Sequence, residues 1–307
     1  MENFSVTSVN NTQAIVSITK LMNVVAIAPF MLFFIFLYFI LQMLKVFCTT
    51  PRLRDNSRYI LFTYLMVNDT VYLFLCILLL SFTLLAFAIP TLACYIIVAL
   101  TSSTFSSTPN GLAAMALERY VAICYPLRHA EICRVERSLV VIGMICIVGL
   151  LPYLVDSIIL VSSVNANFFF QKVMCSREAL FATTLQTLLR FVAHGSIFTV
   201  VALVILFTYI QIVLETKMFN ANKASSSKAS KTVILHAVQL LLCMMSFTYP
   251  ITESYFQNRV VLLRFFNMLA FTILPRFLSP LIYGLRDEAF RNQIKICAPR
   301  GRHKTHP

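Results

Sequence analysis

Long apolar stretches recur along almost the whole chain and restrict its fold more than any other feature of the sequence. A helix needs about 20 consecutive, mostly apolar residues to cross a bilayer, because its backbone groups find no water to bond there. The chain is 59% hydrophobic and only 12% charged, far from the balance of a soluble domain. We therefore predict an all-α integral membrane protein. Seven stretches qualify, at roughly 21–44, 59–85, 90–117, 138–162, 182–214, 233–256 and 261–284.

Almost all of the 307 residues belong to these stretches or to the short connections between them, so no separate soluble domain fits. Residues 1–20 are polar and lack the apolar core of a signal peptide, and we expect the first stretch to direct insertion. The predicted organisation is an N-terminal segment (1–20), a seven-transmembrane helix bundle (21–284) and a tail (285–307). The tail begins with a short amphipathic helix at the membrane surface, over residues 286–296.

Lysine and arginine are distributed unevenly between the two sides of the predicted membrane. Most of the 25 basic residues follow the first, third, fifth and seventh stretches. Such an excess marks the cytoplasmic side, so we predict a multi-pass plasma-membrane protein with an extracellular N-terminus. The net charge of +13 is then mostly this cytoplasmic excess, which attracts anionic lipid and an acidic protein face. It does not require a nucleic-acid partner. Glycosylation sequons at Asn3 and Asn10 fall on the outer side, whereas a third, at Asn68, lies inside a span.

Two of the nine cysteines lie on the predicted outer face. Cys94 is at the outer start of the third stretch, and Cys175 is in the longest predicted extracellular loop, about 163–180. The oxidising exterior permits a disulfide between them. This bond would fasten the loop over the helix bundle.

Residue patterns that support catalysis or cofactor binding are missing from the sequence. No Cys and His spacing resembles a zinc site, and no nucleophile motif is present. With only 6 glycines, a phosphate-cradling loop is nearly excluded. We therefore predict no metal, no cofactor and no enzymatic activity. A membrane transporter remains the alternative class, although the two halves show no internal repeat.

The end of the third stretch carries the most specific motif in the chain. Residues 116–129 read ALERYVAICYPLRH, which closely resembles the odorant-receptor signature MAYDRYVAICxPLRY. Residues 279–283 read SPLIY, similar to NPLIY of that family, and residues 50–54 (TPRLR) resemble fish odorant receptors. The chain departs from the wider rhodopsin-like pattern because it has no Trp, so that residues 247–250 read FTYP. On these motifs it resembles a divergent, fish-type odorant receptor among the rhodopsin-like G-protein-coupled receptors.

The resemblance implies a small-molecule ligand in the outer half of the bundle and a heterotrimeric G protein, of the stimulatory kind that raises cyclic AMP. A rhodopsin-like receptor for a non-olfactory ligand stays open, because the cytoplasmic machinery is shared. Arg119 is costly at a bilayer boundary unless it is paired, and we predict a resting pair with the adjacent Glu118. The resemblance makes Tyr209 and Tyr283 supports of the active arrangement. Two prolines, which each remove a backbone hydrogen bond, provide bending points at Pro250 and Pro280.

Two opposite charges lie near the middle of the predicted membrane. Arg276 is in the seventh stretch, and Asp69 is at a similar depth in the second. Either charge alone would be costly there, so we predict that they form an ion pair. In related receptors the acidic residue at this position often helps to hold a sodium ion, and our hypothesis is that Arg276 replaces that ion.

The predicted ligand residues are polar positions in the outer halves of three spans. Helical spacing from the motif residues selects the third, fifth and sixth stretches. Three basic side chains among them would suit a small anion, although Glu253 could neutralise one. The alternative is that the serines and threonines only form hydrogen bonds between helices. The full set is Thr101, Ser102, Phe105, Ser106, Arg190, His194, Thr252, Glu253, Tyr255 and Arg259.

Overall fold

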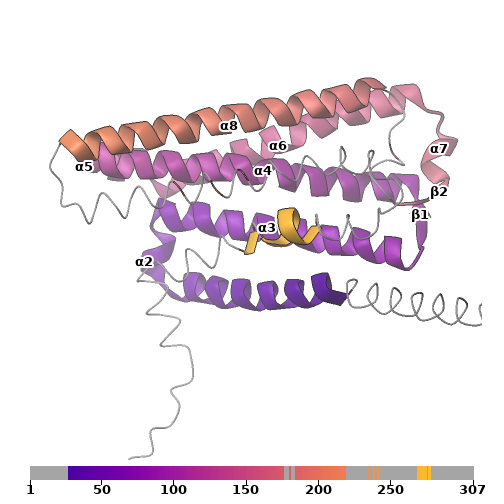
Figure 1. The fold of residues 1–307 in the computed structure, drawn as a ribbon, viewed down its shortest axis with the longest axis horizontal. Helices are drawn as coiled ribbons and strands as arrows, with labels where there is room; N and C mark the ends of the chain where they lie inside the picture. Colours follow the sequence, from indigo (N-terminus) through magenta and orange to yellow (C-terminus); the bar gives the residue numbers. More distant parts are fainter. Residues whose placement is uncertain are drawn as a thin grey trace, which may run out of the picture.

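The described part of the chain is a bundle of long helices. The structure is a computed structural model, and it describes residues 27–175, 180, 184–218, 234, 238, 241, 268–274, 276 and 277. Among these residues, five helices are long and apolar enough to cross a membrane (Figure 1). They are Ile27–Thr49, α3 (Ser57–Leu84), α4 (Thr91–Cys124), α6 (Val135–Ser163) and α8 (Thr184–Met218).

These helices correspond to the first five predicted stretches. Of the seventh stretch, the structure describes the π-helical turn η3 (Met268–Ile273) and the few residues after it. The N-terminal segment with its sequons, nearly all of the sixth stretch and the amphipathic tail lie outside the described residues. Asn68 is buried in α3 and donates hydrogen bonds to the Thr104 carbonyl and the Thr108 hydroxyl, which keeps this third sequon from solvent.

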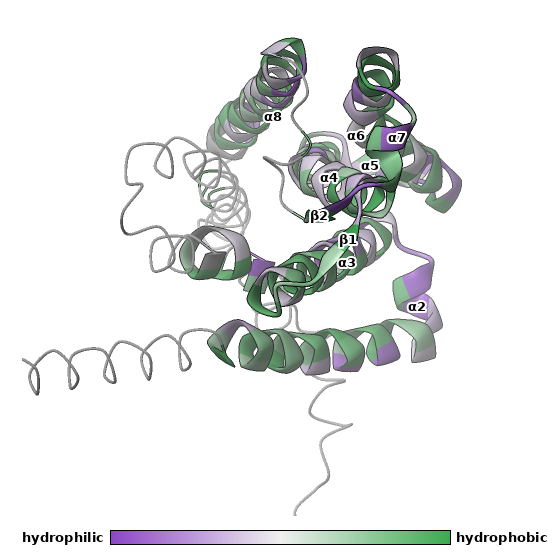
Figure 2. Cartoon of the chain, turned by 90° about the vertical axis from the view of Figure 1, so that its right-hand side faces the viewer, coloured by the Kyte–Doolittle hydropathy of each residue, from purple (hydrophilic) through white to green (hydrophobic). Residues whose placement is uncertain are grey.

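Helix α4 is the central helix of the described bundle. It packs against α3, α6 and α8, and Figure 2 shows it between them. Within its most apolar stretch 56% of the residues are buried, against 22–39% for the other four helices. Its polar side chains are therefore enclosed by protein, whereas large apolar residues of its neighbours, such as Ile158 and Phe191, remain on the outer surface that suits lipid.

The connections at the two ends of the bundle differ. At one end are the short helices α2 (Pro51–Arg54) and α5 (Pro126–Ile132), and at the other are α7 (Asn167–Phe170) and the strands β1 (Ala88–Pro90) and β2 (Lys172–Met174) (Figure 1). The strands pair antiparallel, with Ala88 opposite Met174. Beside them Cys94 and Cys175 form the predicted disulfide, which joins the segment after β2 to the start of α4.

Three helix boundaries differ from the sequence prediction because the helices continue beyond their apolar residues. Arg58 and Arg137 lie just before the second and fourth predicted stretches but belong to α3 and α6. The side chain of Asn56 accepts a hydrogen bond from the Arg58 backbone N–H and so caps α3 before its first apolar residue. Helix α4 continues past residue 117, where the third predicted stretch ends, and ends only at Cys124.

Helices α4 and α6 pack closely against each other at Gly149. A β-carbon added there would lie 2.6 Å from the Ser107 hydroxyl oxygen and 3.1 Å from the Ser103 carbonyl oxygen. The Ser107 hydroxyl already donates to that same carbonyl, so it cannot turn away without losing its hydrogen bond. Small residues at helix crossings in membranes allow such close backbone packing.

We predict that Gly149→Ala lowers the free energy of unfolding by about 1–3 kcal/mol, because the new methyl group overpacks the contact with α4. Gly143→Ala in the same helix is the matched control, since a β-carbon there meets no atom within 4 Å. Thermal unfolding of both variants in detergent measures the difference. Equal melting temperatures for the two variants would contradict the close contact.

Candidate ligand site and activation switch

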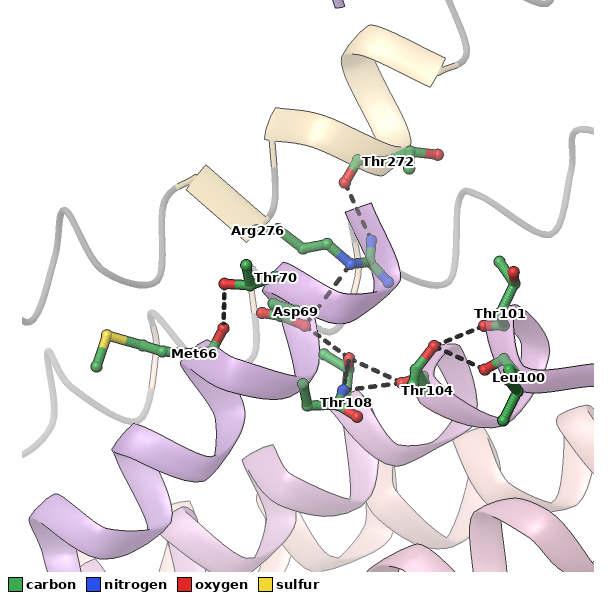
Figure 3. Close-up of polar contacts among 10 residues, drawn as sticks. Met66, Asp69, Thr70, Leu100, Thr101, Thr104, Thr108, Thr272 and Arg276 are labelled. Carbon is green, nitrogen blue, oxygen red and sulfur yellow. Dashed lines mark hydrogen bonds and ion pairs between the residues drawn. The ribbon is translucent and has the colours of Figure 1, made fainter. Parts of the chain in front are cut away.

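The middle of the bundle holds a buried ion pair between α3 and the seventh stretch. Arg276 Nε lies 3.6 Å from Asp69 Oδ1, and their side chains are 0% and 1% exposed (Figure 3). The Thr108 hydroxyl of α4 donates to the same carboxylate oxygen at 2.8 Å. Arg276 Nη1 also donates to the Thr272 carbonyl at 3.0 Å. The two residues predicted to pair are thus brought together, with α4 as a third contributor.

Aromatic rings complete the surroundings of Arg276. Its guanidinium carbon lies 3.8 Å from the centroid of the Tyr72 ring and 5.6 Å from that of Phe105. A cation over a desolvated aromatic face gains electrostatic energy from the ring quadrupole. Tyr72 was not predicted from the sequence, although this residue lies one helical turn after Asp69 and therefore on the same face of α3.

A second buried ion pair joins α6 to α8 at the disulfide end of the bundle. Asp156 Oδ1 accepts from Arg190 Nε at 3.1 Å, and Asp156 Oδ2 accepts from Arg190 Nη2 at 2.5 Å. The Tyr95 hydroxyl of α4 donates to Asp156 Oδ2 at 3.2 Å. Sequence reasoning missed Asp156. It is an acidic residue within an apolar span, and such residues in membranes are rarely without a functional or structural partner.

This pair gives an internal partner to Arg190, one of the three basic residues that would suit a small anion. The Asp156 side chain is 0% exposed and that of Arg190 is 12% exposed, so the guanidinium is already neutralised inside the protein. The sequence prediction treated each basic residue of the fifth stretch alone. The structure supplies its carboxylate from a neighbouring span.

His194 is the centre of a polar cluster one turn farther along α8. Its Nδ1 lies 2.6 Å from the Arg190 carbonyl oxygen, which can only accept, so Nδ1 carries the hydrogen. Its Nε2 is then free to accept from the Tyr153 hydroxyl at 2.8 Å, and the Ser106 hydroxyl lies 3.4 Å away. These contacts are satisfied by a neutral imidazole.

The predicted ligand residues of α4 are buried and face the same region. The ring of Phe105 lies 6.1 Å from that of His194 and 5.8 Å from that of Tyr72. The hydroxyls of Thr101 and Ser106 donate to carbonyls one turn earlier in α4, so part of this polar run serves its own helix. Ser102 is buried beside them. The predicted residues of the sixth stretch, Thr252, Glu253, Tyr255 and Arg259, lie outside the described ranges.

At the opposite end of α4, Glu118 contacts several positive or ionisable groups. Its Oε2 lies 3.7 Å from Arg119 Nε, and its Oε1 lies 3.1 Å from His129 Nε2 in α5. Arg58 of α3 is close enough to interact with the same carboxylate electrostatically. Burial, followed by the negative charge of Glu118, raises the pKa of the Cys133 thiol that follows α5. The predicted pair of adjacent residues is therefore part of a contact that also holds α5.

The remaining predicted switch residues divide between described and undescribed parts of the chain. Tyr209 is partly buried on α8 and packs against the main hydrophobic core. Pro250, Pro280 and Tyr283 fall where the structure describes nothing. Sequence reasoning missed the role of His129 at the Glu118 contact, and the only available signal was its place at the end of the motif.

We predict that Asp69→Asn and Arg276→Met each destabilise the receptor by about 3–5 kcal/mol, because each leaves an uncompensated buried charge. The double variant Asp69→Asn/Arg276→Met should lose much less than the sum of the two. Thermal unfolding and surface expression of the four forms give the interaction energy. Strictly additive losses would show that the two side chains do not stabilise each other.

Comparison with known proteins places this architecture in a family. Residues 41–283 match the family described as 7 transmembrane receptor (rhodopsin family). The chain is 35% identical over 214 residues to Odorant receptor 131-2 of Danio rerio, covering 67% of this chain and 65% of that protein. It is 28% identical over 200 residues to Olfactory receptor 5P3 of Homo sapiens, covering 60% of each. The aligned part thus spans less than two thirds of the length of these relatives.

The family match confirms the predicted seven-helix membrane bundle and the prediction of a receptor in place of an enzyme. It also agrees with a multi-pass protein of the plasma membrane, as the five apolar helices indicate. The predicted resemblance to odorant receptors, including a fish one, is confirmed by the relatives. The chain belongs to the rhodopsin family of seven-transmembrane receptors, and within it the chain is similar to odorant and olfactory receptors.

Proposed function

We propose that this protein is an odorant receptor that binds a small molecule in the outer half of its bundle and activates a heterotrimeric G protein. The observation that carries the proposal is the contact of Glu118 with both Arg119 and His129, within the motif that most resembles odorant receptors. The similarity to Odorant receptor 131-2 supports the same reading. Coupling to the stimulatory G protein, with a rise in cyclic AMP, is part of this proposal.

In the resting state, Glu118 holds Arg119 at the end of α4 and holds α5 through His129. The side chain of Glu118 is only 6% exposed, so its charge is poorly solvated and depends on these partners. Activation separates the carboxylate from Arg119 and presents the arginine to the G protein. A ligand drives this change by binding the active arrangement more tightly than the resting one.

The ligand end of the receptor is built around His194. Phe105 and Ser106 of α4 lie beside this ring, and Thr101 and Ser102 line the same face one turn away. We assign the outer part of the sixth stretch to the same site, with Tyr209, Pro250, Pro280 and Tyr283 transmitting the change toward the cytoplasm. The ligand itself is a small polar molecule, because the polar side chains named above can bond and orient it, as a few placed polar groups do in ligand pockets.

The orientation of the bundle follows from its two ends. The disulfide requires an oxidising compartment, which suits the extracellular side. The opposite end carries α2 and α5 with Arg52, Arg54 and Arg128, a basic edge that suits the anionic cytoplasmic leaflet. An extracellular N-terminus follows, with Asn3 and Asn10 accessible to glycosylation.

The Asp69–Arg276 pair has a separate role in this proposal. The guanidinium supplies a fixed positive charge to the Asp69 carboxylate, at 3.6 Å, where a mobile sodium ion would otherwise be attracted. A pair with no net charge offers little to a cation. We infer that Arg276 serves as a built-in counterion that replaces sodium in this receptor.

Cyclic AMP in cells that express the full chain tests the proposed function. We expect at least one member of a panel of neutral odorants, carboxylates, amines and amino acids to raise cyclic AMP. Arg119→Ala should abolish this response at unchanged surface expression, because it removes the group that meets the G protein. A response that persists in Arg119→Ala, or silence of the surface-expressed receptor with every member of the panel, would contradict the proposal.

We further predict that Glu118→Gln raises basal cyclic AMP above wild type, because a neutral amide holds Arg119 and His129 less firmly. His129→Ala should raise it less, since the Arg119 contact remains. The matched control is Glu131→Gln, which removes a charge from an exposed position of the same short helix α5. Basal signals that rise equally in the control, or that do not rise in Glu118→Gln, would show that this contact is not the resting restraint.

A further inference from the structure

The ion pair between Asp156 and Arg190 lies directly beside the candidate ligand residues. Arg190 contributes its backbone carbonyl to His194, and Asp156 lies one helical turn from Tyr153 on α6. The cluster is therefore continuous: the guanidinium, its carboxylate and the imidazole–hydroxyl pair belong to one set of contacts between α6 and α8. A ligand that reaches His194 is one helical turn from this guanidinium.

Arg190 donates to both oxygens of the Asp156 carboxylate, so these donors are not available to an anionic ligand. The guanidinium binds the two oxygens side by side, in the fork geometry that arginine offers to any carboxylate. The Tyr95 hydroxyl shares its single hydrogen between Asp156 Oδ2, at 3.2 Å, and the Tyr153 carbonyl oxygen, at 3.1 Å. Asp156 thus presents to Arg190 the same chemical group, in the same arrangement, as a carboxylate ligand would.

Displacing Asp156 would be unfavourable for a ligand carboxylate. The Asp156 side chain is fully buried, so leaving Arg190 would strand its charge away from water. A second carboxylate beside an intact pair would add an unpaired negative charge in the same buried region. An uncharged molecule meets neither obstacle, and the His194–Tyr153 pair can rearrange to bond its hydroxyl, carbonyl or amide.

We propose that Asp156 determines the charge specificity of this receptor: it occupies the Arg190 guanidinium internally and thereby excludes carboxylate ligands in favour of uncharged ones. The proposal rests on the proposed function, because it assigns a ligand class to the same site. Asp156 acts through Arg190 and does not itself touch the ligand. It is a specificity-determining residue. The basic residues considered without it would suggest an anionic ligand, the opposite of the ligand class proposed here.

The first test needs no signalling. Asp156→Ala removes the carboxylate and leaves Arg190 beside a space of its size, which free acetate should fill. We expect sodium acetate to raise the melting temperature of purified Asp156→Ala with a saturable dependence, and sodium chloride at equal ionic strength to leave it unchanged. Wild type and Asp156→Ala/Arg190→Met should both ignore acetate, the first because Asp156 is present and the second because the cation is gone.

Asp156→Ser provides the second form if Asp156→Ala cannot be purified, since its hydroxyl adds a polar group beside Arg190 while its shorter side chain still leaves room for acetate. The melting experiment overturns the proposal if acetate stabilises none of the Asp156 variants that retain Arg190. It also overturns the proposal if acetate stabilises wild type as strongly, because Arg190 would then bind anions with Asp156 in place.

A cellular test uses a straight-chain alcohol and the carboxylate of the same length. Wild type should prefer the alcohol by about tenfold or more, and Asp156→Asn should narrow or reverse that preference. A wild-type preference for the carboxylate, or an unchanged ratio in Asp156→Asn, contradicts the proposal. Failure of all panel ligands to signal counts against the proposed function alone, because the acetate titration still decides the role of Asp156.

Discussion

The structure of this receptor depends on the neutralisation of charge where water cannot provide it. An ionised side chain in the interior of a membrane protein is stable only beside an opposite charge and further hydrogen bonds. Arg276 receives both from Asp69 and the Thr272 carbonyl, and the Tyr72 ring covers its guanidinium. Asp156 and Arg190 satisfy the same requirement near the disulfide end of the bundle. Each pair joins separate helices, so neutralisation also fixes how those helices pack.

Helix α4 connects the two ion pairs and the contact of Glu118 at its other end. Thr108 donates to Asp69, Tyr95 donates to Asp156, and Glu118 meets Arg119 and His129. Between the pairs, Phe105 contacts both the His194 ring and the Tyr72 ring. A shift of α4 would therefore alter every one of these contacts together, and a two-state switch needs a rigid element that several sites share. The central position and high burial of α4 suit it to that role.

Much of the fold could be predicted from the sequence, because the length of an apolar stretch decides whether it can span the membrane, almost independently of its tertiary contacts. The Cys94–Cys175 disulfide could be predicted because both cysteines lie on the same predicted side of the membrane, in an oxidising compartment. The pairing of Asp69 with Arg276 could be predicted because either charge alone would be costly inside the membrane. The pairing of Arg190 could not be predicted in the same way. Its partner Asp156 lies in a different span, and only the rotation of α6 against α8 decides that they meet. His129 was hidden because a short loop helix returns it to Glu118, which spacing along one helix cannot reveal.

The dependence of stability on sodium tests the central claim most directly. The melting temperature of purified wild type should stay constant when sodium is exchanged for a large organic cation at fixed ionic strength, because Arg276 already neutralises Asp69. Arg276→Met should acquire a sodium dependence, since its carboxylate is then left without a counterion. A sodium effect in wild type that disappears in Asp69→Asn would contradict the account, because it would mean that Asp69 binds a mobile ion despite the arginine beside it.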